Sequence, residues 1–408
     1  MPITKYGRSP WVDQFPRSRV PSYPKHKGTD PFGVVVIGGG LTGCATAYAL
    51  AAAGVKTTLL EAEQIGRGAT ALSAGLITDD PGVSFTDLEK LVGLRNARRT
   101  FQTWRRSALD FAALLRRLEI RCALEPRTTV TVATTPDQLA RLNKDQKARR
   151  EAGLDAPLLN ARAVRGDVSM DAAAGFRTRE AASIDPYRAC VGLAAAAADR
   201  GVRLFERSPV RRITFNRKTA DVFTAGGSIR TSRVIVATGM PAAPLFKALI
   251  RHFWFCSAYM TVTEALPAKV RHQIAGNEMV IRDSAQPPHI VRWVGEDRVL
   301  ICGADSVSAA ARHRDKIVVQ RTGQLMYEMS TMYPDISGAR PEYGWAADYV
   351  RAANNLPCIG PHRNFPHHLF AFGDSSHSVT GSYLASRMLL RQHFEEMDPG
   401  DAVFGFHR

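Results

Sequence analysis

Three short stretches of the chain contain no polar residue at all, at residues 34–37, 234–237 and 369–372. A strand that is buried on both faces has this pattern, because neither set of alternating side chains meets water. A glycine closely follows each stretch, at Gly38, Gly239 and Gly373. Parallel strands that end in glycine let a long ligand lie across the carboxyl edge of a sheet. The pattern therefore predicts an α/β fold with a ligand at that edge.

The rest of the chain alternates between helical and strand-like patterns. Amphipathic or Ala-rich helices are expected at residues 44–53, 85–118, 136–152 and 187–200, and after Gly373 to about residue 394. Further strands are expected at residues 56–60, 128–132 and 203–206, with a hairpin at 222–229 that turns at a Gly-Gly pair. Strand-like runs at 259–263, 290–293 and 299–302 indicate an antiparallel sheet.

A Gly-Gly-Gly-Leu-Thr-Gly motif, residues 38–43, follows the first apolar strand and opens the first helix. Gly38 permits a tight turn, Gly40 lets a pyrophosphate approach the backbone, and Gly43 lets helix and strand pack closely. The helix N-terminus then offers N–H groups to the anion. Glu61 ends the second strand about 20 residues later, where an acid accepts hydrogen bonds from a ribose diol. This order of elements predicts a dinucleotide site.

Composition narrows the class of protein. With 408 residues, 45% of them hydrophobic, the chain is long enough for two domains. It has no apolar run of about 18 residues and no secretory signal, so we expect no transmembrane segment and a cytoplasmic location. Six scattered cysteines without a C-x-x-C pair or a His cluster indicate reduced thiols and no metal site.

The formal charge of +16 would suit a nucleic-acid partner, but the basic residues are spread along the whole chain. We therefore favour a solvated basic surface, which would also help to hold an anionic dinucleotide. Residues 1–30 are rich in Pro, Arg, Lys and Ser, with Trp11, Phe15 and Tyr23 between them, and cannot form a core. Such aromatic residues can bind nucleic acid, but they more often pin an extended arm to its own domain, which is our expectation here.

The segments around the three glycines carry a wider resemblance. They are Val-Ile-Gly-Gly-Gly-Leu-Thr-Gly (36–43), Gly-Arg-Gly-Ala-Thr-Ala-Leu-Ser-Ala-Gly-Leu (66–76), Ile-Asp-Pro (184–186), Val-Ile-Val-Ala-Thr-Gly (234–239), Leu-Pro-Cys-Ile-Gly (356–360) and Phe-Gly-Asp-Ser-Ser-His-Ser-Val-Thr (372–380). In this order they resemble the FAD-dependent D-amino-acid oxidase superfamily, which includes glycine oxidase, sarcosine oxidase and dimethylglycine dehydrogenase. The resemblance covers residues from about 33 to about 395.

The resemblance implies a Rossmann-like FAD-binding domain made of residues 31–110, 178–240 and 342–408. Residues 111–177 and 241–341 would form a substrate domain of α+β type, with an antiparallel or mixed sheet, over the flavin. The cofactor-binding residues that the resemblance implies are Gly38, Gly40, Leu41, Thr42, Gly43, Glu61, Ala62, Gly68, Ala69, Thr70, Ser73, Ala74, Gly75, Leu76, Val210, Ala237, Thr238, Gly239, Gly373, Asp374, Ser376, His377, Ser378, Val379 and Thr380.

Two departures from the family concern a covalent bond to the flavin. Leu72 stands where dimethylglycine-dehydrogenase-like members place a His that bonds to the flavin. Sarcosine-oxidase-like members use a Cys shortly before the segment that matches residues 357–360, and residues 345–351 contain no Cys. The resemblance thus implies non-covalent FAD.

Two further residues keep alternative roles. Asp374 could hydrogen-bond the ribityl chain of the flavin, or it could cap the helix that follows. His377 could lie near the flavin and tune its charge, which is the role we favour, or it could be a structural histidine.

The family implies oxidation of a C–N bond in a small amine or amino acid, with oxygen or an electron carrier as the final acceptor. An amino-acid substrate needs a guanidinium to hold its carboxylate over the flavin. The family's Arg falls at Tyr349 here, so Arg292 and Arg351 are the candidates, and Tyr259 and Tyr349 are candidate pocket walls.

Two other classes of protein remain open. An NAD-dependent dehydrogenase would use the same nucleotide unit, but it would leave Gly239 and Gly373 unexplained. A non-catalytic binding protein would use the fold and the basic surface to hold nucleic acid or a partner.

Overall fold

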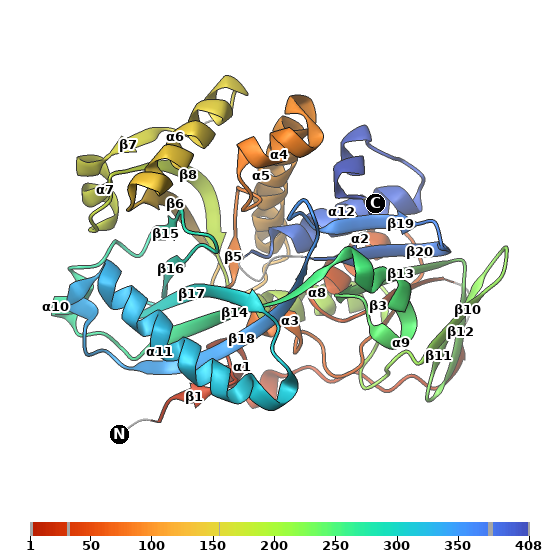
Figure 1. The fold of residues 1–408 in the computed structure, drawn as a ribbon. Coiled ribbons are helices and arrows are strands. Elements are labelled where there is room, and N and C mark those ends of the chain that lie inside the picture. Colours follow the sequence, from red (N-terminus) through yellow and green to blue (C-terminus); the bar gives the residue numbers. More distant parts are fainter. Residues whose placement is uncertain (1–2, 31–32, 155, 374–377, 407–408) are drawn as a thin grey trace.

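The computed structural model describes residues 3–30, 33–154, 156–373 and 378–406. Its strands form three sheets, of ten, six and four strands. In Figure 1 the ten-stranded sheet lies on one side of the molecule, and the six- and four-stranded sheets lie on the other. This mixed α/β architecture agrees with the fold class predicted from the sequence.

The six-stranded sheet contains the three apolar strands that end in glycine. Its order is β19-β20-β13-β3-β4-β9, with β19 antiparallel at one edge and the other five parallel. The strands are β3 (Val34–Ile37), β4 (Thr57–Leu60), β9 (Arg203–Phe205), β13 (Arg233–Gly239), β19 (Cys358–His362) and β20 (Phe365–Phe372). Because β20, β13 and β3 are neighbours, Gly373, Gly239 and Gly38 meet at one carboxyl edge.

Side chains on both faces of this sheet are buried, as its apolar strands predict. Alternate residues such as Val36 and Ile235 pack on one helical layer, while Val35 and Val234 pack against Phe246 on the other face. The helices of the first layer are α2 (Leu41–Ala52), α4 (Phe85–Val92), α5 (Leu94–Arg117), α8 (Pro186–Ala198) and α12 (Thr380–His393). The second face is covered in part by α9 (Ala243–Phe246).

The ten-stranded sheet has the order β1-β18-β14-β17-β16-β15-β6-β8-β5, with β7 beside β8. The strands are β1 (Lys5–Tyr6), β5 (Leu76–Ile77), β6 (Glu125–Ala133), β7 (Leu158–Asn160), β8 (Ala174–Ser183), β14 (Trp254–Thr263), β15 (Met279–Asp283), β16 (Ile290–Val294), β17 (Arg298–Val307) and β18 (Pro341–Arg351). One face packs on α11 (Arg314–Met332). The other face packs on the loop at residues 69–76. The helices α6 (Pro136–Glu151), α7 (Ala161–Val168) and α10 (Ala268–Arg271) lie on the left in Figure 1, on the side of the ten-stranded sheet.

The four-stranded sheet contains the predicted hairpin. Its strands are β10 (Arg212–Phe215), β11 (Ala220–Thr224), β12 (Gly227–Thr231) and β2 (Gly28–Asp30), in that order. The N-terminal arm therefore contributes to two sheets, because β2 pairs with β12 and β1 pairs with β18. Strand pairing at both ends holds the arm against the rest of the chain.

Sheet membership differs from the domain boundaries drawn from the sequence. The ten-stranded sheet includes all of β8, which crosses the boundary at 177/178, and β18, which was expected in the FAD-binding part. The helix α5 crosses the boundary at 110/111, and Phe111 packs with the helices of the six-stranded sheet. The sheet that a strand joins depends on pairing between strands that are distant in the sequence, and no local sequence pattern indicates this pairing. Within the described ranges, none of the helices is both long and apolar enough to cross a membrane.

Candidate functional site

The glycine loop at the end of β3 has the tight geometry that the motif predicts. Gly38 has a φ of +107°, and a Cβ there would come within 2.5 Å of the Ala237 carbonyl oxygen. A Cβ on Gly43 would lie 1.8 Å from the Gly38 carbonyl oxygen. Both positions therefore exclude a side chain. Gly40 is the N-cap of α2 and provides no side-chain cap, which leaves the first turn of the helix suited to an anion.

Glu61 lies at the end of β4 and turns its carboxylate toward the glycine loop. Its Oε2 accepts a hydrogen bond from Gly39 N at 2.6 Å, and its Oε1 accepts one from Glu63 N at 2.8 Å. Ala62 is exposed beside it, and Val210 is half-buried on the segment after β9. The Glu61 carboxylate thus stands next to the backbone that would hold a pyrophosphate, where a ribose is expected.

Gly239 and Gly373 continue the same edge. Gly373 N donates to the Gly239 carbonyl oxygen at 3.1 Å. Gly239 has a φ of +73°, and a Cβ there would meet no described atom within 4 Å. Thr238 Oγ1 donates to the Met240 carbonyl oxygen at 2.7 Å and fixes the turn. Among the described residues, none therefore fills the space beside Gly239, near the point where three strand ends converge.

The loop at residues 68–76 closes over the glycine motif. Gly68 is the N-cap of the short helix α3 (Ala69–Leu72). Thr70 Oγ1 accepts a hydrogen bond from Leu41 N, the first residue of α2, at 2.9 Å. Gly75 has a φ of +68°, and a Cβ there would lie 2.4 Å from the Ile184 carbonyl oxygen. The structure thus brings together two segments that were predicted to bind one cofactor.

Three consecutive carbonyl groups of this loop are held by side chains from distant segments. Trp345 and Trp11 donate their indole N–H groups to the carbonyl oxygens of residues 72 and 73, each at 3.0 Å. Arg292 donates to the Ala74 carbonyl oxygen from Nε at 2.9 Å and from Nη2 at 2.6 Å. The loop is therefore fastened both to the ten-stranded sheet and to the N-terminal arm, where Trp11 lies in α1 (Pro10–Asp13).

Arg292 does not have the surroundings of a substrate clamp. Its side chain is only 4% exposed, and its Nη1 donates to the Trp293 carbonyl oxygen at 3.0 Å. The Trp11 ring covers the guanidinium, with its centroid 5.1 Å away, and burial lowers the pKa of Arg292 to about 10. All three nitrogen atoms of the guanidinium group thus donate hydrogen bonds to backbone carbonyl groups of the protein. The structure therefore corrects the expectation that Arg292 holds a substrate carboxylate.

The N-terminus of α12 meets the same loop. Val379 N donates to the Leu76 carbonyl oxygen at 2.8 Å. Thr78 N donates to Thr380 Oγ1 at 2.9 Å, and Thr78 Oγ1 donates to Ser378 Oγ at 2.8 Å. These bonds join residues that are about 300 positions apart. The other predicted residues of this segment, Asp374, Ser376 and His377, lie outside the described residues.

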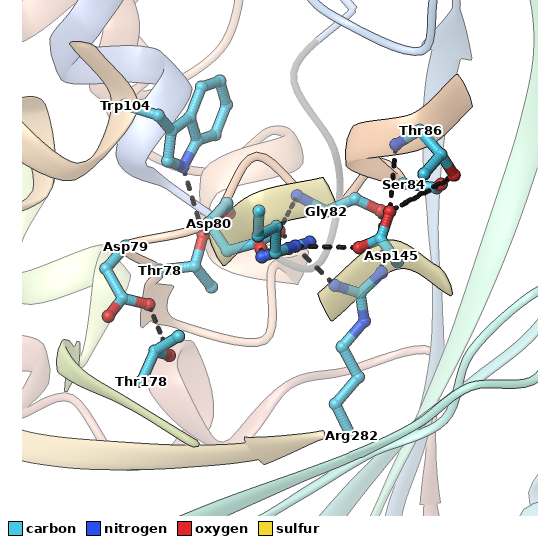
Figure 2. Close-up of polar contacts among 11 residues, drawn as sticks. Thr78, Asp79, Asp80, Gly82, Ser84, Thr86, Trp104, Asp145, Thr178 and Arg282 are labelled. Atoms are coloured by element: carbon cyan, nitrogen blue, oxygen red, sulfur yellow. Dashed lines mark hydrogen bonds and ion pairs between the residues drawn. The ribbon is translucent and has the colours of Figure 1, made fainter. Parts of the chain in front are cut away.

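Thr78 leads into a buried polar network that the sequence analysis missed (Figure 2). Asp79 accepts hydrogen bonds from Thr178 Oγ1 at 2.9 Å and from Glu180 N at 3.0 Å. Burial raises the pKa of the Asp79 carboxyl group. Trp104 Nε1 donates to Thr78 Oγ1 at 3.3 Å and closes the network on the side of α5.

Arg149 of α6 joins the next two acids of this network. It pairs with Asp80 and, at 2.8 Å, with Asp145. Arg282 of β15 donates to the Gly82 carbonyl oxygen at 2.7 Å. Burial alone would raise the pKa of Asp80, but the two guanidinium groups outweigh it and lower that pKa. The network thus anchors the segment after β5 to the ten-stranded sheet (Figure 2).

Tyr259 lies on the face of the ten-stranded sheet that is turned away from the loop. Its side chain is 3% exposed, it packs in the cluster on α11, and the Arg321 guanidinium lies 5.6 Å from its ring centroid. Its neighbours Ala258 and Met260 pack toward the loop instead. Because successive residues of a strand face opposite sides, Tyr259 cannot share a pocket with them. The structure therefore corrects its assignment as a pocket wall.

Tyr349 lies on the face that packs against the loop. Its hydroxyl group donates to Asp305 Oδ2 at 2.6 Å. Arg351, two residues on, is exposed, and its guanidinium lies 6.0 Å from the Trp254 ring centroid. Asp305 was not predicted, because its position beside Tyr349 depends on both strands pairing with β14.

Comparison with known proteins decides the family. A model of the family described as FAD dependent oxidoreductase matches residues 33–392. The chain belongs to the FAD-dependent oxidoreductase family. It is 27% identical to gamma-glutamylputrescine oxidoreductase of Escherichia coli (strain K12), covering 90% of this chain and 85% of that protein. It is 23% identical to glycine oxidase of Bacillus licheniformis, covering 88% and 93%.

A solved structure gives the same fold. Glycine oxidase from Geobacillus kaustophilus superposes with a TM-score of 0.74 at 18% identity, covering 92% of this chain and 98% of that one. The family match over residues 33–392 shows that FAD is the cofactor and that the protein is an FAD-dependent oxidoreductase. The described residues fit FAD, because a helix whose N-cap Gly40 has no side chain, a carboxylate at Glu61 and a Gly239 with no described atom near its Cβ position line one edge. The NAD-dependent and non-catalytic alternatives are set aside.

Proposed function

We propose that this oxidoreductase oxidises a C–N bond of a small amine or amino acid. FAD, when bound, supplies the acceptor for the hydride that leaves the carbon next to the nitrogen. The names of two relatives support this substrate class, since they denote oxidation of gamma-glutamylputrescine and of glycine, both of which contain a C–N bond. Water then hydrolyses the imine product, and oxygen or an electron carrier takes up the electrons.

The observation that carries the proposal is the position of β18. Its first half fastens the cofactor loop through Trp345, and its last residues reach the carboxyl edge, where the Val350 carbonyl oxygen lies 3.2 Å from the Cβ position of Gly373. Side chains of the ten-stranded sheet therefore border the place where the cofactor is expected. The apolar residues on this face exclude water, and Tyr349 and Asp305 provide polar groups at its edge. Sites favour such boundaries between two parts of a fold.

The test is anaerobic reduction of the bound flavin. The purified protein is expected to absorb near ~450 nm, as flavoproteins do, and to lose this band when a substrate delivers a hydride. Glycine, N-methylglycine, n-butylamine and 1,4-diaminobutane represent the proposed class. Glycerol 3-phosphate is the contrasting probe, because it presents a C–O bond. Bleaching by glycerol 3-phosphate and by none of the nitrogen compounds would overturn the proposed function.

A further inference from the structure

The N-terminal arm, residues 3–30, lies outside the segment that defines the family, because the family model matches residues 33–392. The arm nevertheless pairs at both of its ends, through β1 with β18 of the ten-stranded sheet and through β2 with β12 of the four-stranded sheet. In Figure 1 it runs, in red, along one side of the molecule between these two strands. Between its ends the arm contacts two segments that are assigned to the cofactor.

The front of the arm, residues 3–16, holds the cofactor loop. Trp11 Nε1 donates to the Ser73 carbonyl oxygen at 3.0 Å. The ring of Trp11 also covers the guanidinium group of Arg292, 5.1 Å from the ring centroid, and Arg292 binds the Ala74 carbonyl oxygen through two nitrogen atoms. Without Trp11, one carbonyl group would lose this donor, and the guanidinium group that holds the next carbonyl group would be uncovered. The front of the arm thus fixes two consecutive peptide groups of the loop.

The second half of the arm, residues 17–30, holds the segment that follows Glu61. Glu206 is only 1% exposed and joins the two by its carboxylate. Its Oε2 accepts a hydrogen bond from Tyr23 N at 3.2 Å, and its Oε1 accepts one from Ile65 N at 2.9 Å. The arm is therefore fastened on both sides of the place where the cofactor is expected.

The front of the arm can detach without opening the core. Within residues 3–16, all of which the structure describes, burial is confined to residues 9–11. The strongest polar anchor is Asp13, whose Oδ2 accepts hydrogen bonds from Lys5 Nζ at 2.6 Å and from Tyr343 Oη at 2.9 Å. Segments with few buried apolar contacts open locally, at a fraction of the cost of global unfolding. The front of the arm has the character of such a separately opening segment.

We infer that the front of the arm is a strap that retains FAD, with Trp11 as a positioning residue for the cofactor loop. FAD leaves after the strap has detached, because the loop then loses the groups that hold its carbonyls at residues 73 and 74. Coupling between two binding events is reciprocal, so bound FAD in turn holds the strap against the loop. The inference concerns the cofactor alone and is independent of the substrate class in the proposed function.

The first experiment measures hydrogen exchange of the arm in the FAD-loaded and the FAD-depleted protein. Free FAD at about 100 times its dissociation constant favours the FAD-binding form by a factor of about 100. We therefore expect backbone amides of residues 3–16 to exchange at least about tenfold more slowly with FAD. The control is α7, whose buried residues pack on the face of the ten-stranded sheet toward α11, and which should exchange equally in both forms. Equal exchange of residues 3–16 with and without FAD would overturn the inference.

The second experiment loosens the strap at a point that does not touch the cofactor loop. Asp13→Asn weakens the bonds to Lys5 and Tyr343 and should raise the rate of FAD release about five- to tenfold, the effect of a weakened charged hydrogen bond. Release is followed by the recovery of free-flavin fluorescence after dilution. Asp167→Asn is the matched control, because its side chain is also 22% exposed and forms an ion pair with Arg177, in α7. It should change the rate less than about twofold.

Trp11→Ala separates a strap from a local effect of one indole group. Both variants of the arm should release FAD faster than Asp167→Asn, with Trp11→Ala the faster of the two, because it loses the loop contact itself. Fast release by Trp11→Ala with a rate for Asp13→Asn within twofold of the control would overturn the strap. Should Trp11→Ala fail to fold, Asp13→Asn still decides, since it keeps the size and shape of the side chain.

Discussion

Gly43 shows how strongly a single residue can constrain the cofactor site. A Cβ at this position would lie 1.8 Å from the Gly38 carbonyl oxygen, so Gly43→Ala must displace either α2 or the glycine loop. We expect a loss of about 1–3 kcal/mol of unfolding free energy, as for an overpacked interior, and loss of most bound FAD. Gly323→Ala in α11 is the control, since its Cβ would meet no described atom within 4 Å, and it should stabilise the helix by up to about 1 kcal/mol. Urea unfolding and flavin content after gel filtration measure both effects.

His368 should make the protein sensitive to acid. Its ring is 1% exposed on β20, it stacks on Phe370 with centroids 5.8 Å apart, and burial lowers its pKa to about 4. Above the unfolded-state pKa of about 6.5, this histidine is neutral in both states, and the unfolding free energy is at its full value. As the pH falls toward 4, the unfolded chain binds a proton that the folded chain does not, so the unfolding free energy decreases. The difference between the unfolded and the folded pKa corresponds to roughly 3 kcal/mol of unfolding free energy. His368→Leu should therefore lose less unfolding free energy than the parent between pH 7 and pH 4.5. Parallel pH profiles of the two proteins would contradict the shift.

At the scale of elements, the loop at residues 69–76 takes its shape from groups outside it. Trp345→Phe removes the indole donor but keeps most of the buried ring, which leaves the carbonyl group of residue 72 without this partner. We expect a cost of about 1–3 kcal/mol, which lowers FAD affinity about 5- to 150-fold. Trp293→Phe is the control, because Trp293 makes the same kind of bond, to the Ala275 carbonyl oxygen at 2.7 Å, on the face toward α11. It should lower stability while FAD affinity stays within about twofold. Equal FAD affinities of the two variants would show that the loop does not depend on Trp345.

The elements that the sequence predicts well are those with local signatures. Residues 34–37 are buried on both faces, and their apolar pattern reports this directly. Strand β18 has the opposite character: its residues are mixed in polarity, and only its pairing with β14 places Tyr349 beside the carboxyl edge. Arg292 likewise looked like a free guanidinium in the sequence, because the carbonyl group that it binds lies more than 200 residues away.

At the scale of the whole molecule, the cofactor segments come from both ends of the chain. Thr78 N donates a hydrogen bond to Thr380, and Trp11 of the N-terminal arm donates one to the Ser73 carbonyl group of the loop. FAD should therefore stabilise the complete fold, because it binds the assembled segments and not the unfolded chain. The expected gain is about 2.7 kcal/mol when free FAD exceeds its dissociation constant 100-fold. The midpoint of thermal unfolding of the FAD-depleted protein should rise with added FAD, and it should stay constant with added NAD.

The same assembly should release its FAD when it unfolds in acid. Leu72 has no nucleophile, and burial raises the pKa of the Cys256 thiol, which disfavours the thiolate that a covalent bond would need. Precipitation with trichloroacetic acid should therefore leave a colourless pellet and a yellow supernatant that contains intact FAD. A yellow pellet would contradict non-covalent binding. The adduct would then be sought first at Cys256, because this thiol stands in register with Tyr349 of β18, the strand whose end reaches the cofactor edge.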